Sequence, residues 1–121
     1  MQVEEEKLIF LTAKILSDRG EVVKINSDGR RFININGKKL IPDLLTLDKK
    51  DNIKGIYEVI INAEKSRLLK FKEVAETTEF NLIIPYEKQK EVETLIKETK
   101  VNVKSILCFV KKKPSKRKRI Y

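Results

Sequence analysis

Apolar and polar residues follow one another along the chain in runs that predict a series of helices and strands. In the first segment Leu8, Leu11 and Ile15 fall on one stripe at helical spacing. Shorter runs rich in Val, Ile, Leu and Phe, bounded by Gly, Asn, Asp or Pro, are typical of strands. The predicted order is helix 3–19, strands 21–26, 31–36, 40–47 and 53–61, helix 63–78, strand 80–84, helix 85–100 and a last strand within 101–110.

The stretch 40–61 is the most informative part of this pattern. Two mostly apolar runs, 40–47 and 53–61, flank the polar cluster 48–52, which predicts a β-hairpin. Odd and even positions are both mostly apolar, as in strands that are covered on both faces, so we expect the hairpin at the centre of a sheet. Because the strands before it are antiparallel and the later ones alternate with helices, the chain is predicted to be a mixed α/β protein with helices packed on a sheet.

Each strand of the predicted hairpin carries one acid among its apolar residues, Asp43 and Glu58. If the turn centres between Lys50 and Asp51, the two acids lie directly opposite each other. A slip of one residue would send one acid to the other face of the sheet. The same register opposes two further pairs, Leu40 with Ile61 and Asp48 with Ile53.

Opposed residues of an antiparallel pair share a face, with Cβ atoms about 4.5–5.5 Å apart. Two carboxylates at that distance destabilise a sheet, and burial increases the cost. A shared proton, a basic neighbour or a divalent cation would offset the repulsion. We therefore expect Asp43 and Glu58 to have one of these three partners.

Composition excludes several other kinds of site. The sequence has no histidine, which excludes histidine metal ligands and Ser–His or Cys–His nucleophile pairs. Its four dispersed glycines form no phosphate-binding loop. Cys108 is the single cysteine, so no internal disulfide is expected, and a cytoplasmic location is favoured. No apolar run approaches the ~20 residues of a membrane span, so no membrane partner is expected.

Much of the net charge of +9 lies in the C-terminal segment, so we predict one domain over residues 1–110 and a basic flexible tail over 111–121. Such a tail suits sequence-independent contact with DNA phosphates, although a solubilising end or a membrane-surface patch is an alternative. Further basic residues cluster at the predicted turns around residues 30 and 38. The candidates for nucleic-acid binding are Arg30, Arg31, Lys38, Lys39, Lys111, Lys112, Lys113, Lys116, Arg117, Lys118 and Arg119.

Pro42-Asp43, fourteen further residues and then Glu58-Val59-Ile60 lie on a hairpin between an acid-bearing helix and a following helix and strand. This arrangement, over about residues 3–84, resembles the PD-(D/E)xK nuclease superfamily, of which the small archaeal Holliday-junction resolvases are one branch. The resemblance implies a restriction-endonuclease-like fold, a mixed sheet with an αβββαβ core flanked by helices. It also implies that Asp43, Glu58 and Glu5 bind Mg²⁺ or Mn²⁺ and that DNA is the partner. Nucleases that cut both strands are often two-fold dimers, which leaves a homodimer open.

One position departs from the family pattern, because Ile60 stands where the family has its catalytic lysine. The resemblance also implies an alternative place for this lysine, on the next helix, and a helix returning over Glu58 would bring Lys72, or else Lys70, near the acids. The alternative is that both lysines simply face solvent. The sequence therefore leaves open a metal-dependent DNA endonuclease that hydrolyses phosphodiester bonds, a catalytically degenerate nuclease-fold protein that binds nucleic acid without cutting it, and a protein-interaction module.

Overall fold

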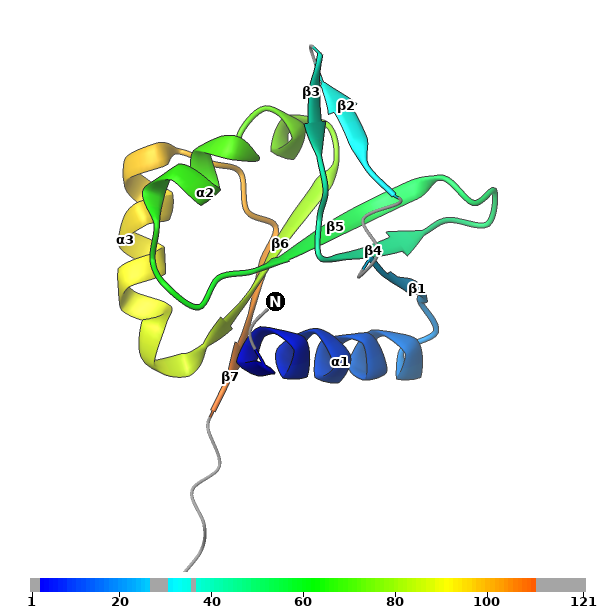
Figure 1. Cartoon of the computed structure of the whole chain (residues 1–121), viewed down its shortest axis with the longest axis horizontal. Helices are drawn as coiled ribbons and strands as arrows, with labels where there is room; N and C mark the ends of the chain where they lie inside the picture. Colours follow the sequence, from blue (N-terminus) through cyan, green and yellow to red (C-terminus); the bar gives the residue numbers. More distant parts are fainter. Residues whose placement is uncertain (1–2, 27–30, 36, 111–121) are drawn as a thin grey trace, which may run out of the picture.

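A five-stranded mixed sheet organises the chain, for which the computed structural model describes residues 3–26, 31–35 and 37–110 (Figure 1). The strand order is β1-β4-β5-β6-β7, with β4 antiparallel to both of its neighbours and β5, β6 and β7 parallel. The mixed α/β prediction is confirmed, and β5 is the central strand. The strands are β1 (Val22–Ile25), β4 (Leu44–Leu47), β5 (Ile53–Val59), β6 (Glu79–Pro85) and β7 (Ser105–Phe109).

One face of the sheet is covered by α1 (Val3–Asp18), which confirms the first predicted helix. Its apolar stripe buries Leu8, Ile9 and Leu16 in a cluster with Leu44, Val59 and Ile83 of the strands. In the described part of the chain, no helix has the length and apolar character needed to cross a membrane.

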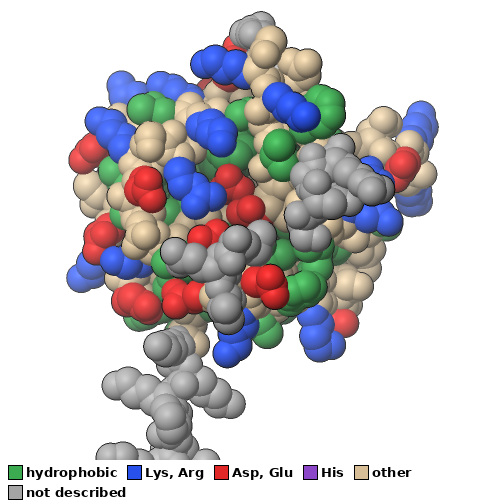
Figure 2. Space-filling model, in the orientation of Figure 1, with side chains coloured by type: hydrophobic (Ala, Val, Ile, Leu, Met, Phe, Trp, Pro, Cys, Tyr) green, Lys and Arg blue, Asp and Glu red, His purple; other side chains and the backbone are tan. Residues whose placement is uncertain are grey.

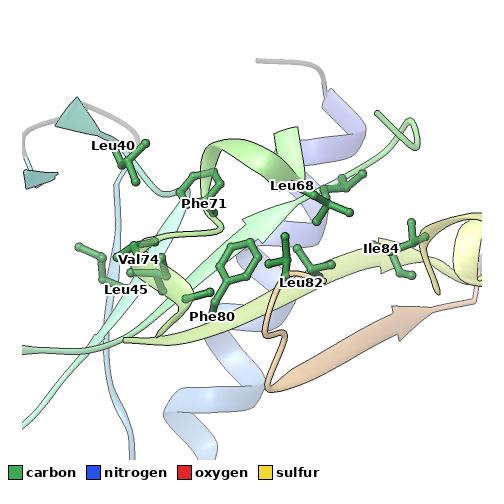
Figure 3. Close-up of a cluster of buried hydrophobic side chains, with 13 residues drawn as sticks. Leu40, Leu45, Leu68, Phe71, Val74, Phe80, Leu82 and Ile84 are labelled. Carbon is green, nitrogen blue, oxygen red and sulfur yellow. The ribbon is translucent and has the colours of Figure 1, made fainter. Parts of the chain in front are cut away.

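The opposite face is covered by α2 (Lys65–Lys70), the short 3₁₀ turn η1 (Val74–Glu76) and α3 (Gln89–Thr99). Figure 3 shows the apolar cluster that these elements form with the sheet. At its centre the rings of Phe71 and Phe80 stack with their centroids 5.1 Å apart. A second 3₁₀ turn, η2 (Tyr86–Lys88), precedes α3, so the predicted helix 85–100 begins a few residues late.

The predicted helix 63–78 is much shorter in the structure, and Asn62 does not cap it, because α2 begins after Glu64. Buried Leu68, Phe71 and Val74 recur every third residue, which matches three residues per turn. From the end of α2 onward the backbone includes three-residue bonds of this spacing, in which the Phe71 N–H donates to the Leu68 carbonyl and the Thr77 N–H donates to the Val74 carbonyl. The tighter winding turns these side chains into the core, at the cost of a regular helix.

The predicted strand 40–47 is interrupted at Pro42, and the prediction that Leu40 opposes Ile61 is wrong. Instead Leu40 ends β3 (Lys38–Leu40), which pairs with β2 (Ile33–Ile35) in a separate two-stranded sheet and opposes Ile33. The predicted turn at 37–39 is therefore a strand that starts after Gly37, whose φ of +81° suits a glycine. We call β2 and β3 together the β2–β3 ribbon; it stands at one end of the molecule in Figure 1.

The hairpin register agrees with the prediction near the acids and differs from it near the turn. Leu44 pairs with Tyr57 and Leu45 with Ile56, as predicted, but an irregularity after Thr46 makes Leu47 pair with Ile53. The predicted opposition of Asp48 and Ile53 is therefore wrong. Asp48 instead closes the turn, since its side chain accepts hydrogen bonds from two backbone N–H groups, those of Lys50 and Asn52.

Candidate active site

The two acids of the hairpin converge, as predicted. Asp43 directly precedes β4, and continuing the pairing of Leu44 with Tyr57 by one residue places it opposite Glu58 of β5. Both lie on the face covered by α2, because Glu58 stands between Ile56 and Ile60, which pack in the cluster beneath α2 and α3. The side chain of Glu58 is 5% exposed and that of Asp43 is 18% exposed, so the pair is buried on one side and open on the other.

Each carboxylate is held by a backbone N–H of the neighbouring strand. The Asp43 N–H donates to Glu58 Oε1 at 3.2 Å, and the Val59 N–H donates to Asp43 Oδ2 at 2.9 Å. These two bonds replace the backbone ladder where the chain bends at Pro42. Because Val59 belongs to β5 and Asp43 directly precedes β4, the acids are fixed beside the central strands, as a binding site requires.

A third side chain completes the site, and sequence reasoning missed it. The guanidinium of Arg67 on α2 places its Nη2 atom 3.3 Å from Glu58 Oε2 and 3.9 Å from Asp43 Oδ2. The prediction of Lys72 or Lys70 depends on a helix that begins at residue 63. An extended segment precedes α2, so the first turn of the helix lies over the acids. Nothing in the sequence pattern indicates that residues 60–64 stay outside the helix, so the sequence carries no clear signal for Arg67.

Burial and the neighbouring Asp43 together raise the pKa of Glu58 well above its ordinary value. The leading cause is desolvation, followed by the hydrogen bond to Asp43 and its negative charge, while Arg67 acts in the opposite direction. The arginine therefore offsets only part of the combined effect of burial and Asp43 on this pKa.

This raised pKa predicts a pH dependence of stability. The folded state binds the Glu58 proton more tightly than the unfolded chain does, so this stabilisation is complete below about pH 4.5 and is lost as the pH rises through the folded-state pKa. We expect the free energy of unfolding, measured in urea from about pH 4 to about pH 8, to fall more steeply with pH in the wild type than in Glu58→Gln. The difference between the two slopes should reach up to about 1.4 kcal/mol per pH unit. Equal slopes in the two proteins would contradict the assignment.

The lysines predicted to serve the site lie further along α2 and the turn that follows it. Lys70 and Lys72 are both exposed, and the ammonium of Lys70 is 6.0 Å from the Phe71 ring centroid. Among the described residues, the cation within ion-pair distance of both acids is Arg67. Ile60, at the position of the family lysine, is 1% exposed and belongs to the core.

The third acid implied by the resemblance is not brought to the pair. Glu5 is half-buried near the start of α1, a helix that packs on the opposite face of the sheet. Within residues 3–26, 31–35 and 37–110, no three acidic or cysteine side chains form a group able to hold a metal ion. Figure 2 shows acidic side chains gathered at the centre of one face, with Lys and Arg side chains around them.

The donor set of Asp43 and Glu58 fits Mg²⁺ nonetheless. Mg²⁺ keeps several waters and is commonly held by one or two carboxylates together with substrate phosphate, so three protein ligands are not required. A carboxylate has about four lone-pair directions, and each of these two uses one of them for a backbone N–H. Both side chains can therefore still bind a cation if Arg67 moves aside.

A buried asparagine holds the loop that carries Asp43. The Asn26 side-chain amide donates to the carbonyls of Pro42 at 2.8 Å and Arg31 at 2.7 Å, and its oxygen accepts the Arg31 N–H. The backbone N–H of Asn26 donates to the carbonyl of Asp43 at 3.0 Å. Asn26 thus joins β1, the start of the β2–β3 ribbon and the acidic pair.

The basic candidates divide between described and undescribed parts of the chain. Arg31 is half-buried where the chain enters the β2–β3 ribbon, and Lys38 and Lys39 are exposed on β3. Arg30 and the predicted tail 111–121 lie outside the described residues.

In comparisons with protein-family models, curated proteins and solved structures, nothing matches this chain.

Proposed function

We propose that this chain is a metal-dependent DNA endonuclease with a restriction-endonuclease-like fold, and that it hydrolyses phosphodiester bonds at the Asp43–Glu58 pair. The observation that supports this most directly is the pair itself. Two carboxylates, one of them buried, face each other across the central strands, where they raise the cost of folding. A divalent cation bound between the two carboxylates would offset that cost and would serve phosphodiester hydrolysis.

The side chains would divide the work as follows. Asp43 and Glu58 would hold Mg²⁺, which when bound polarises the scissile phosphate and lowers the pKa of a bound water. Arg67 cannot act as a base, because a guanidinium stays protonated, but its planar donors match a phosphate. With the carboxylates holding a dication, Arg67 would be free to bind the charge that develops on the phosphate. Lys72 and Lys70 remain candidates for stabilising the attacking hydroxide.

A second function is favoured by two specific observations. Arg67 already supplies a cation to the pair, and the position of the family lysine is filled by the buried Ile60. In a catalytically degenerate protein, Arg67 would be the permanent counter-ion, and the chain would bind nucleic acid without cutting it. This alternative needs no metal.

One assay separates the two. Supercoiled, linear and branched DNA are incubated with the protein in Mg²⁺, in Mn²⁺ and in EDTA, and both cleavage and retention on a gel are recorded. Nicking that requires the metal and disappears in Asp43→Ala supports the endonuclease. Retention at about 50 mM salt without cleavage supports the degenerate protein, since phosphate contacts are strongest at low salt. Neither cleavage nor retention would contradict both.

A further inference from the structure

The β2–β3 ribbon is the part of the described chain that the five-stranded sheet does not use. Its two strands pair only with each other, with Ile33 opposite Leu40 and Ile35 opposite Lys38. Leu40 and Ile33 anchor its base against the apolar cluster under α2. The rest of the ribbon extends away from the sheet (Figure 1).

The surface of the ribbon combines positive charge with an exposed aromatic ring. Phe32 is 44% exposed, and the ammonium of Lys39 lies 4.4 Å from the centroid of its ring. Lys38 is the preceding residue of β3 and is exposed on the other face of the ribbon, and Arg31 directly precedes Phe32. The sequence has no acid between residues 31 and 42, so no carboxylate of the ribbon itself offsets these charges. The ring contact favours one position of the Lys39 side chain, which reduces the entropy lost on binding an anion.

The ribbon is fixed to the acidic pair. Leu40, the last residue of β3, is three residues before Asp43, so their Cα atoms are at most about 11 Å apart. Asn26 donates hydrogen bonds to the carbonyls of both Arg31 and Pro42, and so holds together the two ends of the segment 31–42 that contains the ribbon. Figure 2 shows Lys and Arg side chains where Figure 1 places β2 and β3, on the same face as the central acidic group.

A pair of carboxylates repels the phosphates of any DNA that approaches it. Positive charge on the flank of the acidic pair offsets this repulsion. Lys38 and Lys39 precede Asp43 by five and four residues, so their Cα atoms are at most about 18 and about 14 Å from it. A two-stranded antiparallel ribbon is also narrow enough to enter the major groove of duplex DNA.

We propose that the β2–β3 ribbon is a duplex-DNA-binding arm, in which Lys38 and Lys39 contact the phosphate backbone and hold it beside Asp43 and Glu58. This proposal rests on the proposed function for its choice of partner. It assigns to the ribbon the binding of substrate, which is separable from the cleavage step.

The test compares two double variants of the full chain. Lys38→Ala/Lys39→Ala removes the charges of the ribbon, whereas Lys49→Ala/Lys50→Ala removes the same number of exposed charges from the β4–β5 turn, at the other end of the hairpin. Binding to a labelled duplex is measured in EDTA, so that no cleavage occurs, at several salt concentrations. Because both variants keep the basic segment 111–121, the difference between them reports on the ribbon.

We expect Lys38→Ala/Lys39→Ala to bind duplex roughly tenfold more weakly at low salt and to lower the magnitude of the salt slope by about 2, one for each lost phosphate contact. The turn variant should bind like the wild type. Equal losses in the two variants, or a ribbon loss seen with single-stranded DNA but not with duplex, would overturn the proposal. Both variants alter exposed side chains, and thermal unfolding checks that each remains folded.

The two proposals can fail separately. Cleavage by the wild type together with normal binding by Lys38→Ala/Lys39→Ala would overturn the ribbon proposal and leave the endonuclease standing. Ribbon-dependent binding without any cleavage would overturn the endonuclease proposal and leave the ribbon proposal standing. Asp43→Ala should lose cleavage. When each lysine double variant is combined with Asp43→Ala, the difference in duplex binding between the two should remain.

Discussion

Asp43→Asn is expected to reduce Mg²⁺-dependent DNA cleavage by at least about 100-fold, because it removes one of two charges that would hold the metal. The amide oxygen of asparagine can still accept the Val59 N–H, so the bend before β4 should be preserved. The measurement is the rate at which supercoiled DNA becomes nicked, at saturating metal. A loss of activity without a loss of stability would assign the effect to the charge.

The chain offers a matched control for this variant. Asp48→Asn makes the same chemical change in the β4–β5 turn, where the side chain accepts two backbone N–H groups and binds no cation in our account. It should cleave at the wild-type rate. Equal activity of Asp43→Asn and Asp48→Asn would contradict the assignment of Asp43 to the metal.

Arg67→Gln is expected to destabilise the protein in EDTA by about 1–3 kcal/mol, because it leaves the buried Glu58 without its cationic partner. Added Mg²⁺ should recover that stability. It should also stabilise the variant more than the wild type, since in the wild type Mg²⁺ must first displace the guanidinium. The measurement is the change in Tm with Mg²⁺ concentration for each protein.

Lys14→Gln is the control for the loss of an ion pair as such. Lys14 pairs with Asp18 on the exposed surface of α1, with the two side chains 75% and 68% exposed, and such pairs contribute little. Its Tm should match the wild type with and without Mg²⁺. If Mg²⁺ stabilises Arg67→Gln no more than it stabilises Lys14→Gln, Arg67 is a permanent counter-ion and the degenerate alternative is favoured.

The pairing of Asp43 with Glu58 could be predicted from the sequence because the central hairpin restricts its own register. Both of its runs are apolar on two faces, and the polar cluster between them places the turn. The irregularity after Thr46 lies between the acids and the turn, so it shifts the pairing of Leu47 without moving Asp43.

The position of Arg67 could not be derived in the same way. It depends on where α2 begins, and α2 begins where Leu68 and Phe71 can reach the core, which is a tertiary effect. The strand break at Pro42 is also a tertiary effect. A proline in an apolar run signals a break, but the new pairing of β3 with β2 depends on the Asn26 contacts, which link residues far apart in the sequence.

The central claim is that Asp43 and Glu58 form a cation site, and the most direct measurement is the titration of the Glu58 carboxyl by ¹³C NMR. Its resonance is assigned by comparison with Glu58→Gln. In EDTA we predict a pKa well above the ordinary 4.5, because of burial and the adjacent Asp43. In Mg²⁺ we predict a lower pKa, since a bound cation favours the charged form. The same pKa in Mg²⁺ and in EDTA would contradict the account.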